Sequence, residues 1–380
     1  MKIAWLCNSA MGTSETFLGD NLDILKEIGE VRAFSGNPAP DNQGRPDVTH
    51  LSFDDVPQRL HHVLRKKLSG HDVRTQSKRK RCLQQLLGPL KSFDPDIIWV
   101  EFGTTAHIAS GLLEALGKPY FIAVHGFDIT REFRDPWYKS EFVRLANASA
   151  GLICASHHTH NLCRTAGVNE SKGHVVRLPL NGDRLKRTQP FPSDPIRFLH
   201  LGRLVEKKGP MQTLLAFHGV LGTHPKAQLT FVGEGPLRPQ LEAYVRDNRL
   251  ESSVTLTGAL EQQQAMDLLQ QQHIFCQHSV TGMDGDQEGF ALSPAEAALF
   301  EMPVIATWHN GIPEHVSHEE TGLLVREWDI PAMTQAMSML ASNAEMRTKL
   351  GAAGRKRILA LCDPAKRKAA LSTILESAMG

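Results

Sequence analysis

Two cations flank a turn in the stretch GRLVEKKGP, residues 202–210. An apolar run typical of a strand ends at the first glycine, and the closing Gly-Pro pair indicates the start of a helix. Arg203 and Lys208 lie between these points. Cations beside a helix N-terminus favour an anion such as a phosphate. The alternative is two solvated charges on a surface loop, the commoner fate of Arg and Lys.

A glycine-containing loop follows the apolar run 274–279 and carries a candidate sugar and diphosphate site. A carboxylate in such a loop can hold sugar hydroxyls, which makes Glu288 a candidate contact. The backbone amides of Gly289 and Phe290, with a helix N-terminus behind them, would suit a diphosphate.

Glu296 has two interpretations. Ser293 stands where a helix N-cap belongs, Pro294 fits the first helical position, and Glu296 comes three residues after the cap. This spacing predicts a capping box with a purely structural glutamate. The other interpretation is that the carboxylate accepts hydrogen bonds from ribose hydroxyls, as an acid does in dinucleotide-binding sites.

Two further candidates stand in loops after apolar runs. His125 opens the sequence HGFD directly after PYFIAV, where the carboxyl end of a strand meets a ligand; the alternative is a satisfied core histidine. Gly12 lies in the loop after the first run and either allows close backbone approach or only makes a turn.

Metal binding is not favoured by the two patterns that could indicate it. Asp284 and Asp286 have DxD spacing, but they belong to a glycine-rich loop for which a flexible polar role is the simpler interpretation. His157, His158 and His160 follow Ser156, which is typical of an N-cap, and they lack a fourth ligand at a useful spacing. We therefore predict no metal site.

Short apolar runs alternate with longer amphipathic stretches along the whole chain, which predicts doubly wound parallel sheets. The amphipathic stretches include 209–222, 236–248 and 294–300, and residues 331–379 are almost all helix-forming. The runs that indicate strands are 2–8, 96–102, 119–126, 151–156, 196–202, 227–235, 253–258, 274–279 and 303–308.

The length of 380 residues favours two domains. Prolines and polar residues give the segment 179–195 the composition of a linker. We expect an α/β domain over residues 1–180 and a second over 190–363, with the helix at about 364–380 packing back on the first. A ligand would bind beyond the carboxyl ends of the strands, in a cleft between the domains.

Charge and composition narrow the function. The formal net charge is +1, which argues against a nucleic-acid-binding protein. The six cysteines are scattered, which is typical of core residues in a reducing compartment. No apolar stretch approaches the roughly 18 residues of a membrane span, so we expect a cytoplasmic protein.

Residues 59–91 depart from this balance, with ten basic residues and one acid, Asp72. Such a run is either a solvated helix face or a contact for anionic lipid head groups or a phosphate-bearing acceptor. The second interpretation would place the protein peripherally on the inner face of a cell membrane.

Taken together, these stretches resemble the family 4 glycosyltransferases, whose GT-B fold consists of two Rossmann-like domains. EGFALSPAE has the two glutamates of that family with seven residues between them, and NGIPEHV and TGLLV resemble the stretches that follow it in the family. GRLVEKKG is similar to the phosphate-binding turn, VGEGP to the next strand end, and HGFD to the histidine of the N-terminal domain. SETFL, DGDQEG and TWHNGIPE are most similar to the branch that builds bacterial exopolysaccharide and lipopolysaccharide, including colanic-acid-type enzymes.

The resemblance implies a retaining transfer without metal or cofactor, from a UDP- or GDP-linked sugar to a saccharide or lipid-linked saccharide. It implies roles for the candidate residues: diphosphate binding by Arg203 and Lys208, donor-sugar contact by Glu288 with Gly289 and Phe290, ribose binding by Glu296, a sugar contact by His125, and a phosphate contact at Gly12. Arg203, Lys208, Glu288 and His125 would be the catalytic set.

The sequence departs from the family pattern at Glu301, Asn310 and His278, of which Asn is tolerated in a left-handed conformation. Two other classes of function remain open. One is a GT-B sugar-nucleotide epimerase or hydrolase, and the other is a two-domain ligand-binding protein without turnover.

Overall fold

The computed structural model describes residues 1–8, 16–36, 47–51 and 71–379. Gly12 and the part of the basic segment before His71 lie outside these residues. The chain divides into two compact units, and both ends of the sequence belong to the first. Unit 1 comprises Met1–Leu178 with Ala365–Gly380, and unit 2 comprises Pro179–Pro364. Among the described helices, none combines the length and apolar character that crossing a bilayer requires.

Unit 1 contains a parallel sheet of seven strands in the order β3-β2-β1-β4-β5-β6-β7. Its central strands are buried along their whole length, as near-continuous apolar runs such as IIWVE and YFIAV require. The strands are β1 (Lys2–Cys7), β2 (Glu30–Ser35), β3 (Val48–His50), β4 (Ile97–Glu101), β5 (Tyr120–Val124), β6 (Gly151–Cys154) and β7 (Gly173–Val175).

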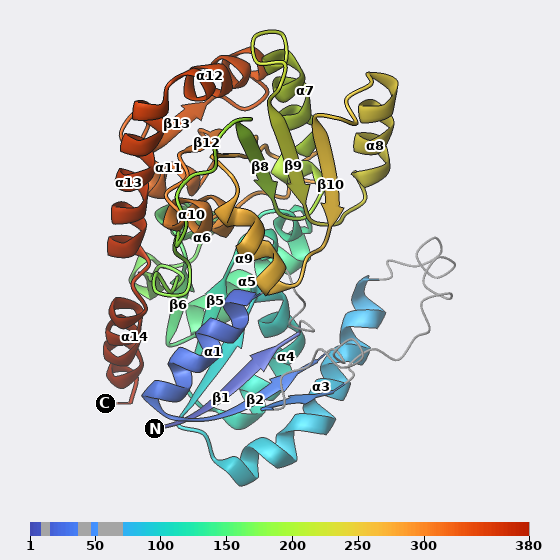
Figure 1. The fold of residues 1–380 in the computed structure, drawn as a ribbon. Coiled ribbons are helices and arrows are strands. Elements are labelled where there is room, and N and C mark those ends of the chain that lie inside the picture. The colour runs from blue at the N-terminus through green and yellow to red at the C-terminus, as the bar shows by residue number, and fades with distance from the viewer. Residues whose placement is uncertain (9–15, 37–46, 52–70, 380) are drawn as a thin grey trace. The chain divides into compact units, whose positions relative to one another are not determined.

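Helices cover both faces of this sheet (Figure 1). One face packs against α3 (His71–Phe93), α4 (Gly103–Leu116), α5 (Pro136–Ala148) and α6 (His157–Ala166). The other packs against α1 (Thr16–Ile28) and α14 (Pro364–Ser377). Ser156 caps α6 in a capping box with Thr159, which confirms the N-cap predicted there.

The last helix, α14, is held to unit 1 by apolar and polar contacts. Leu371 and Leu375 are fully buried in the cluster that contains Trp5. The Arg367 guanidinium donates to the carbonyl oxygens of Val176 and Arg177 at 2.9 and 2.7 Å. The end of the sequence is therefore part of the core that forms around its beginning.

Unit 2 contains a parallel sheet of six strands in the order β10-β9-β8-β11-β12-β13. The strands are β8 (Arg197–Leu201), β9 (Gln228–Val232), β10 (Val254–Gly258), β11 (Ile274–Cys276), β12 (Val304–Thr307) and β13 (Gly322–Val325). The helices are α7 (Pro210–Val220), α8 (Arg238–Asp247), α9 (Gln262–Gln270), α10 (Leu292–Leu299), α11 (Ile312–His315), α12 (Ile330–Ser342) and α13 (Ala344–Leu361). Figure 1 shows α7 and α12 side by side, where they share a hydrophobic core with β8 and β9.

The segment 179–195, interpreted from composition as a linker, is held against unit 2. The Arg187 guanidinium donates to the carbonyl oxygens of Phe300, Gln270 and Gln272, and it stacks on the Phe191 ring. Burial lowers the pKa of Arg187 to about 10. A polar, proline-rich composition therefore marks the start of unit 2 and not a free connection.

Candidate active site

The strand order of unit 2 fixes where its loops can meet. The neighbouring strands β8 and β11 lie at the point where the order reverses, because the chain leaves β8 towards β9 and leaves β11 towards β12. In open parallel sheets, ligands bind outside the carboxyl ends of the strands at this switch point. The two loops that begin there, residues 202–209 and 277–291, contain most of the candidate residues.

Close backbone packing joins these two loops. Gly209 has φ +57°, and a Cβ there would lie 1.7 Å from the carbonyl oxygen of His278. The N–H of Val280 donates to the carbonyl oxygen of Lys207 at 3.0 Å. Only glycine permits this approach at residue 209, so the Gly-Pro pair that begins α7 also sets the distance between the loops.

Lys208 and Glu288 form a buried ion pair at this junction. The Lys208 Nζ lies 3.1 Å from the Glu288 Oε1, and the two side chains are 14% and 7% exposed. Burial by itself raises the pKa of Glu288, but the positive charges of Lys208 and then Lys207 outweigh it, so the pKa falls to about 2. The pair is not aligned as a hydrogen bond, so Oε1 keeps its lone pairs without a donor among the described residues. Glu288 is therefore an ionised, buried carboxylate with accepting capacity left.

The neighbouring pair, Lys207 with Asp286, has a different role. The Lys207 Nζ donates to Asp286 Oδ1 at 3.0 Å, and both side chains are nearly buried. The Asp286 N–H in turn donates to Asp284 Oδ1 at 3.0 Å. The two aspartates of the DxD spacing thus brace their own loop. Across the part of the chain that the structure describes, no group of three or more His, Cys, Asp or Glu side chains could hold a metal ion.

Arg203 lies on the same turn as Lys208 but points into solvent. Its side chain is exposed, and the guanidinium makes no ion pair or hydrogen bond with any residue that the structure describes. The structure therefore brings Lys208 and Glu288 together and leaves Arg203 at the edge of the turn, where it could reach a ligand.

Gly289 and Phe290 continue the loop towards α10. Phe290 is buried, its ring lies 4.7 Å from that of His315, and its carbonyl oxygen accepts a hydrogen bond from His315 Nε2 at 2.7 Å. The start of α11 packs directly on this loop, because a Cβ at Gly311 would lie 2.2 Å from the Gly289 carbonyl oxygen.

The capping box predicted around Glu296 is wrong. Helix α10 begins at Leu292, its N-cap is Ala291 with φ +58°, and the cap makes no side-chain hydrogen bond. Ser293 lies inside the helix, and its hydroxyl donates to Gln277 Oε1 at 3.0 Å. The Ser293 hydroxyl therefore bonds to Gln277 on the loop after β11 and does not cap the helix. Glu296 lies half-buried in the second turn of α10.

In unit 1, His125 forms a second buried pair with a residue that the sequence analysis missed. Its Nε2 lies 2.7 Å from Glu101 Oε2, and the two side chains are 7% and 0% exposed. Because the strands β4 and β5 are neighbours, their carboxyl ends place these residues together. The available signal was the glutamate next to last in the apolar run DIIWVEF, since a charged residue is rarely fully buried without a partner.

Glu101 also accepts from three other side chains on the sheet and α1. The indole N–H of Trp99 donates to Oε1 at 2.9 Å, with longer contacts from Trp5 at 3.3 Å and Asn21 at 3.4 Å. Burial raises the pKa of Glu101, but the hydrogen bond to His125 and the charge of its ring outweigh this, and the pKa is lowered overall. Glu101 is therefore ionised, and His125 Nε2 carries a proton.

The loop around His125 is rigidly held. Asp128 Oδ1 accepts the N–H groups of His125 and Gly126, and its Oδ2 accepts the N–H of Gly103. The His125 ring packs between Phe17 and Phe102 at centroid distances of 4.7 and 4.8 Å. Its Nδ1 is buried and has no hydrogen-bond partner among the described residues.

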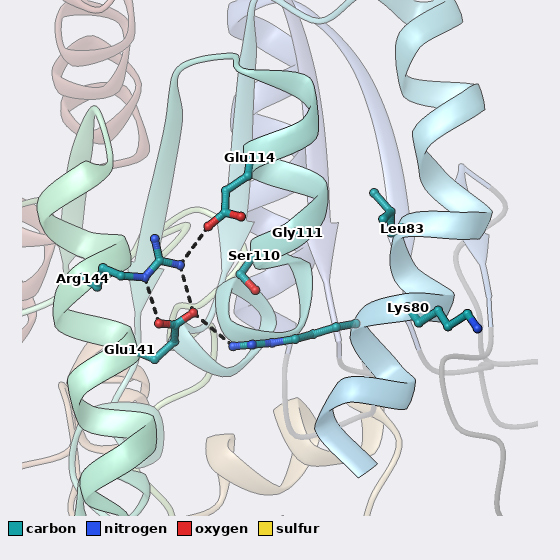
Figure 2. Close-up of a pocket in the computed structure, with 8 residues that line it drawn as sticks. Lys80, Leu83, Ser110, Gly111, Glu114, Glu141 and Arg144 are labelled. Atoms are coloured by element: carbon teal, nitrogen blue, oxygen red, sulfur yellow. Dashed lines mark hydrogen bonds and ion pairs between the residues drawn. The ribbon is translucent and has the colours of Figure 1, made fainter. Parts of the chain in front are cut away.

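A hollow of about 420 Å³ on unit 1 is lined by α3, α4 and α5 (Figure 2). Arg144 pairs with Glu141 at 2.8 Å and with Glu114 at 3.0 Å, and Arg79 pairs with Glu141 at 3.1 Å. Lys80 points away from this cluster (Figure 2). Both carboxylates of the hollow are therefore paired with arginines, and none of the candidate donor-site residues lines it.

Comparisons with known proteins identify the fold and the two domains. The model of the group 1 glycosyl transferases matches residues 182–357, and that of glycosyltransferase family 4 matches residues 32–184. The solved structure of Anabaena Alr3699/HepE in complex with UDP-glucose superimposes with a TM-score of 0.78 at 16% identity, covering 99% of this chain and 100% of that one. This likeness shows the fold.

Two curated relatives are bacterial. The amylovoran biosynthesis glycosyltransferase AmsK of Erwinia amylovora is 29% identical over 254 residues, 66% of this chain and 62% of AmsK. The putative colanic acid biosynthesis glycosyltransferase WcaL of Escherichia coli K12 is 28% identical over 250 residues, 65% of this chain and 61% of WcaL. The alignments thus span about three fifths of the relatives' length. The two family models together reach from residue 32 to residue 357, and the chain belongs to the family 4 glycosyltransferases, with two parallel α/β units of the GT-B type.

Proposed function

We propose that the protein is a glycosyltransferase that moves a sugar from a nucleotide-sugar donor to a saccharide or lipid-linked saccharide in the synthesis of a bacterial surface polysaccharide. The observation that carries this proposal is the Lys208–Glu288 pair at the switch point of unit 2. Family membership and the printed roles of AmsK and WcaL support the polysaccharide context.

The pair supplies a cation for the diphosphate and a carboxylate for the sugar hydroxyls. Lys208 directly precedes Gly209, the N-cap of α7, so its ammonium and the helix N-terminus can together hold a diphosphate. Lys207 pairs with Asp286 within the loop, so we assign the diphosphate to Lys208, which lies beside Glu288, with Arg203 joining from the solvent side. Glu288 Oε1 would accept donor-sugar hydroxyls, with Gly289 and Phe290 beside it and Glu296 on the ribose.

A retaining mechanism without metal fits this charge distribution. When the bond between sugar and diphosphate breaks, negative charge develops on the departing phosphate, and Lys208 and Arg203 stabilise it in place of a metal ion. The departing phosphate takes the proton of the acceptor hydroxyl on the same face of the sugar. No residue then needs to act as a nucleophile, unlike in retaining glycoside hydrolases.

His125 would contact the donor sugar from unit 1. With Nε2–H bound to Glu101, Nδ1 is the ring nitrogen left to meet a sugar hydroxyl. The donor base is uracil or guanine in this proposal. The HepE complex with UDP-glucose favours testing uridine nucleotides first.

The decisive experiment is calorimetric titration with UDP and GDP, followed by turnover with the matching sugar nucleotides. Lys208→Ala should weaken nucleoside diphosphate binding at least tenfold, since a charged hydrogen bond contributes about 1.5–3 kcal/mol. Lys226→Ala, which removes an exposed lysine, is the matched control. Equal affinity in both variants would rule the site out.

The same assay separates the other two classes of function. Release of nucleoside diphosphate without any acceptor indicates a hydrolase, and an altered sugar on an intact nucleotide indicates an epimerase. Binding without either product indicates a ligand-binding protein without turnover.

A membrane-facing role for α3 is part of the proposal. Lys80 is exposed and would contact anionic head groups, which attract each nearby Lys or Arg by about 1 kcal/mol. Its neighbour Arg79 is turned into the protein, where it donates to the His107 carbonyl oxygen and to Glu141. The protein would then work peripherally on the cytoplasmic face of the membrane.

A further inference from the structure

We propose that His309 and Glu327 form a positioning pair that fixes the backbone of Glu288 and so aims its carboxylate. His309 follows β12, Glu327 follows β13, and both strands end at the same edge of the sheet as β11. The inference concerns how the proposed donor site is held, and its role in donor binding rests on the proposed function.

The Glu327 carboxylate is committed on both oxygens. Oε1 lies 2.6 Å from His309 Nδ1, and Oε2 accepts the N–H of Thr281 at 2.9 Å. Burial raises the pKa of Glu327, but the hydrogen bond to His309 and that from Thr281 outweigh it, and the pKa is lowered. An ionised carboxylate only accepts, so His309 must carry a proton on Nδ1.

The opposite nitrogen of His309 independently requires the same tautomer. The backbone N–H of Glu288 points to Nε2 at 3.2 Å, and the side-chain amide of Asn310 approaches it at 2.9 Å. A backbone N–H can only donate, so Nε2 must offer its lone pair. Both sides of the ring therefore select the neutral form with the proton on Nδ1.

This ring connects three loops at the proposed site. Through Glu327 it reaches Thr281 at the start of the loop after β11, and through Nε2 it reaches Glu288 near the end of that loop. Asn310 adds a hydrogen bond to Gln287 Oε1 at 3.0 Å. His309 itself is fully buried, so water cannot take the place of Glu288 or Glu327 at its ring nitrogens. The arrangement leaves Glu288 one backbone position from which to meet Lys208.

Glu327→Gln tests the pair because a glutamine cannot keep both bonds. If its amide oxygen accepts from Thr281, its NH₂ group donates to His309 Nδ1 and moves the ring proton to Nε2, opposite the Glu288 N–H. If its oxygen accepts from His309, its NH₂ group faces the Thr281 N–H. Either way, one of the hydrogen bonds that connect Thr281 to Glu288 through Glu327 and His309 is lost, while the shape of the side chain hardly changes.

The first measurement is the ring tautomer, read from ¹⁵N NMR of labelled protein without ligand. The expected result is the Nδ1-protonated neutral ring in the native chain and loss of that state, or of the Thr281 amide shift, in Glu327→Gln. An Nε2-protonated ring in the native chain would overturn the proposal. This readout is independent of any nucleotide, so it stands apart from a failure of the proposed function.

The second measurement is binding of a sugar nucleotide and of its nucleoside diphosphate. Glu327→Gln should weaken the sugar nucleotide by about tenfold or more, as loss of an outer-shell partner does, and the nucleoside diphosphate by much less, because Lys208 is untouched. Glu319→Gln is the matched control, since Glu319 is exposed and lies beside another histidine, His318, at 3.7 Å.

His309→Gln and His309→Phe complete the test. A glutamine oxygen can accept the Glu288 N–H in place of Nε2, whereas phenylalanine offers no acceptor. Discrimination between sugar nucleotide and diphosphate should be partly kept by the first variant and lost by the second. Equal weakening of both ligands in Glu327→Gln, or discrimination unchanged in all three variants, would overturn the positioning role.

Discussion

Each unit holds a histidine against a glutamate near the carboxyl ends of its sheet, but the two pairs use opposite ring nitrogens. In unit 1 the carboxylate takes Nε2 of His125, and the buried Nδ1 has no partner among the described residues. In unit 2 the carboxylate takes Nδ1 of His309, and two N–H groups face Nε2. The first arrangement leaves one ring nitrogen without a partner among the described residues, whereas the second engages both nitrogens in contacts within the protein.

The two carboxylates also differ in their burial and in the number of donors around them. Glu101 is fully buried and is surrounded by indole, amide and imidazole donors from the sheet and α1. Glu327 is partly exposed and binds one backbone N–H besides its histidine. His125 is thus oriented by a fully buried carboxylate, whereas His309 is oriented by one that solvent partly reaches.

The largest effect is expected at Glu101. Glu101→Ala removes one partner of a buried pair and strands two indole N–H groups, so we expect a loss of about 3–5 kcal/mol in the free energy of unfolding. Glu327→Ala should cost only about 1–3 kcal/mol, because solvent reaches that carboxylate. Urea unfolding followed by circular dichroism compares them, and equal losses would remove the distinction between the pairs.

His125→Phe tests whether the partnerless nitrogen serves a ligand. The ring packs between two phenylalanines, but the variant leaves the buried Glu101 carboxylate without its ion-pair partner, so we expect it to fold with a loss of about 3–5 kcal/mol in the free energy of unfolding. If Nδ1 accepts from the donor sugar, turnover should fall by about 10²-fold, or close to 3 kcal/mol in activation free energy. Steady-state kinetics measures this, with thermal melting as the control, and normal turnover in the folded variant would return His125 to a core role.

Acid should act on unit 2 through His200. Burial, followed by the charge of Lys208, lowers the pKa of His200 to about 3. Between that value and its ordinary pKa near 6.5, the unfolded chain binds more protons than the folded chain, so stability falls as pH falls. The expected loss from this residue between pH 7 and pH 5 is about 2 kcal/mol. In His200→Phe, the free energy of unfolding should differ less between pH 7 and pH 5 than it does in the native chain. An unchanged difference would mean that other groups cause the acid sensitivity.

Two adjacent basic residues of α3 provide a matched pair on unit 1. Lys80→Gln should weaken binding to anionic vesicles by about 1 kcal/mol and leave stability unchanged, because Lys80 is exposed. Arg79→Gln should instead lower stability, since it breaks the bonds to His107 and Glu141. Co-sedimentation at low and moderate salt tests the first effect. Equal, negligible binding to anionic and neutral vesicles would identify the helix as a solvated face.

The smallest effect concerns one equivalent turn in each unit. The helix between β4 and β5 ends at Gly117 with φ +60°, whereas the corresponding turn after α10 has Glu301 at φ +58°. A non-glycine residue there costs about 1–2 kcal/mol, which the greater freedom of an unfolded glycine partly offsets. We therefore expect Glu301→Gly to stabilise by about 0.5–1 kcal/mol and Gly117→Ala to destabilise by a similar amount. Thermal melting that showed no change for either variant would mean that the backbone accommodates both.

The sequence was sufficient to predict features that depend on strand order. All nine apolar runs are strands, and the closeness of Lys208 and Glu288 results from two loops that leave neighbouring parallel strands. The strands β2, β3, β7 and β13 were missed, and in the short edge strands β3 and β7 little apolar pattern was available to indicate them. Asn310 does adopt φ +49°, the left-handed conformation that Asn tolerates.

Features that depend on contacts between residues far apart in the sequence could not be predicted. The bond from Ser293 to Gln277 overrides a local capping pattern, and no spacing rule includes a partner 16 residues away. The Glu101–His125 pair requires knowing that β4 and β5 are neighbours. The sequence does not distinguish His309 among the 18 histidines, because its hydrogen bonds to Glu327 and Glu288 join it to other loops.

The return of α14 to unit 1 has a consequence for biosynthesis. Because Leu371 and Leu375 complete a core that contains Trp5, we expect unit 1 to finish folding only after α14 has left the ribosome. Unit 2 is a continuous segment inserted between these two parts and can reach its native state earlier. We expect the nascent chain to hold the apolar face that awaits α14 uncovered while unit 2 is made, a period in which chaperones would bind unit 1 and not unit 2.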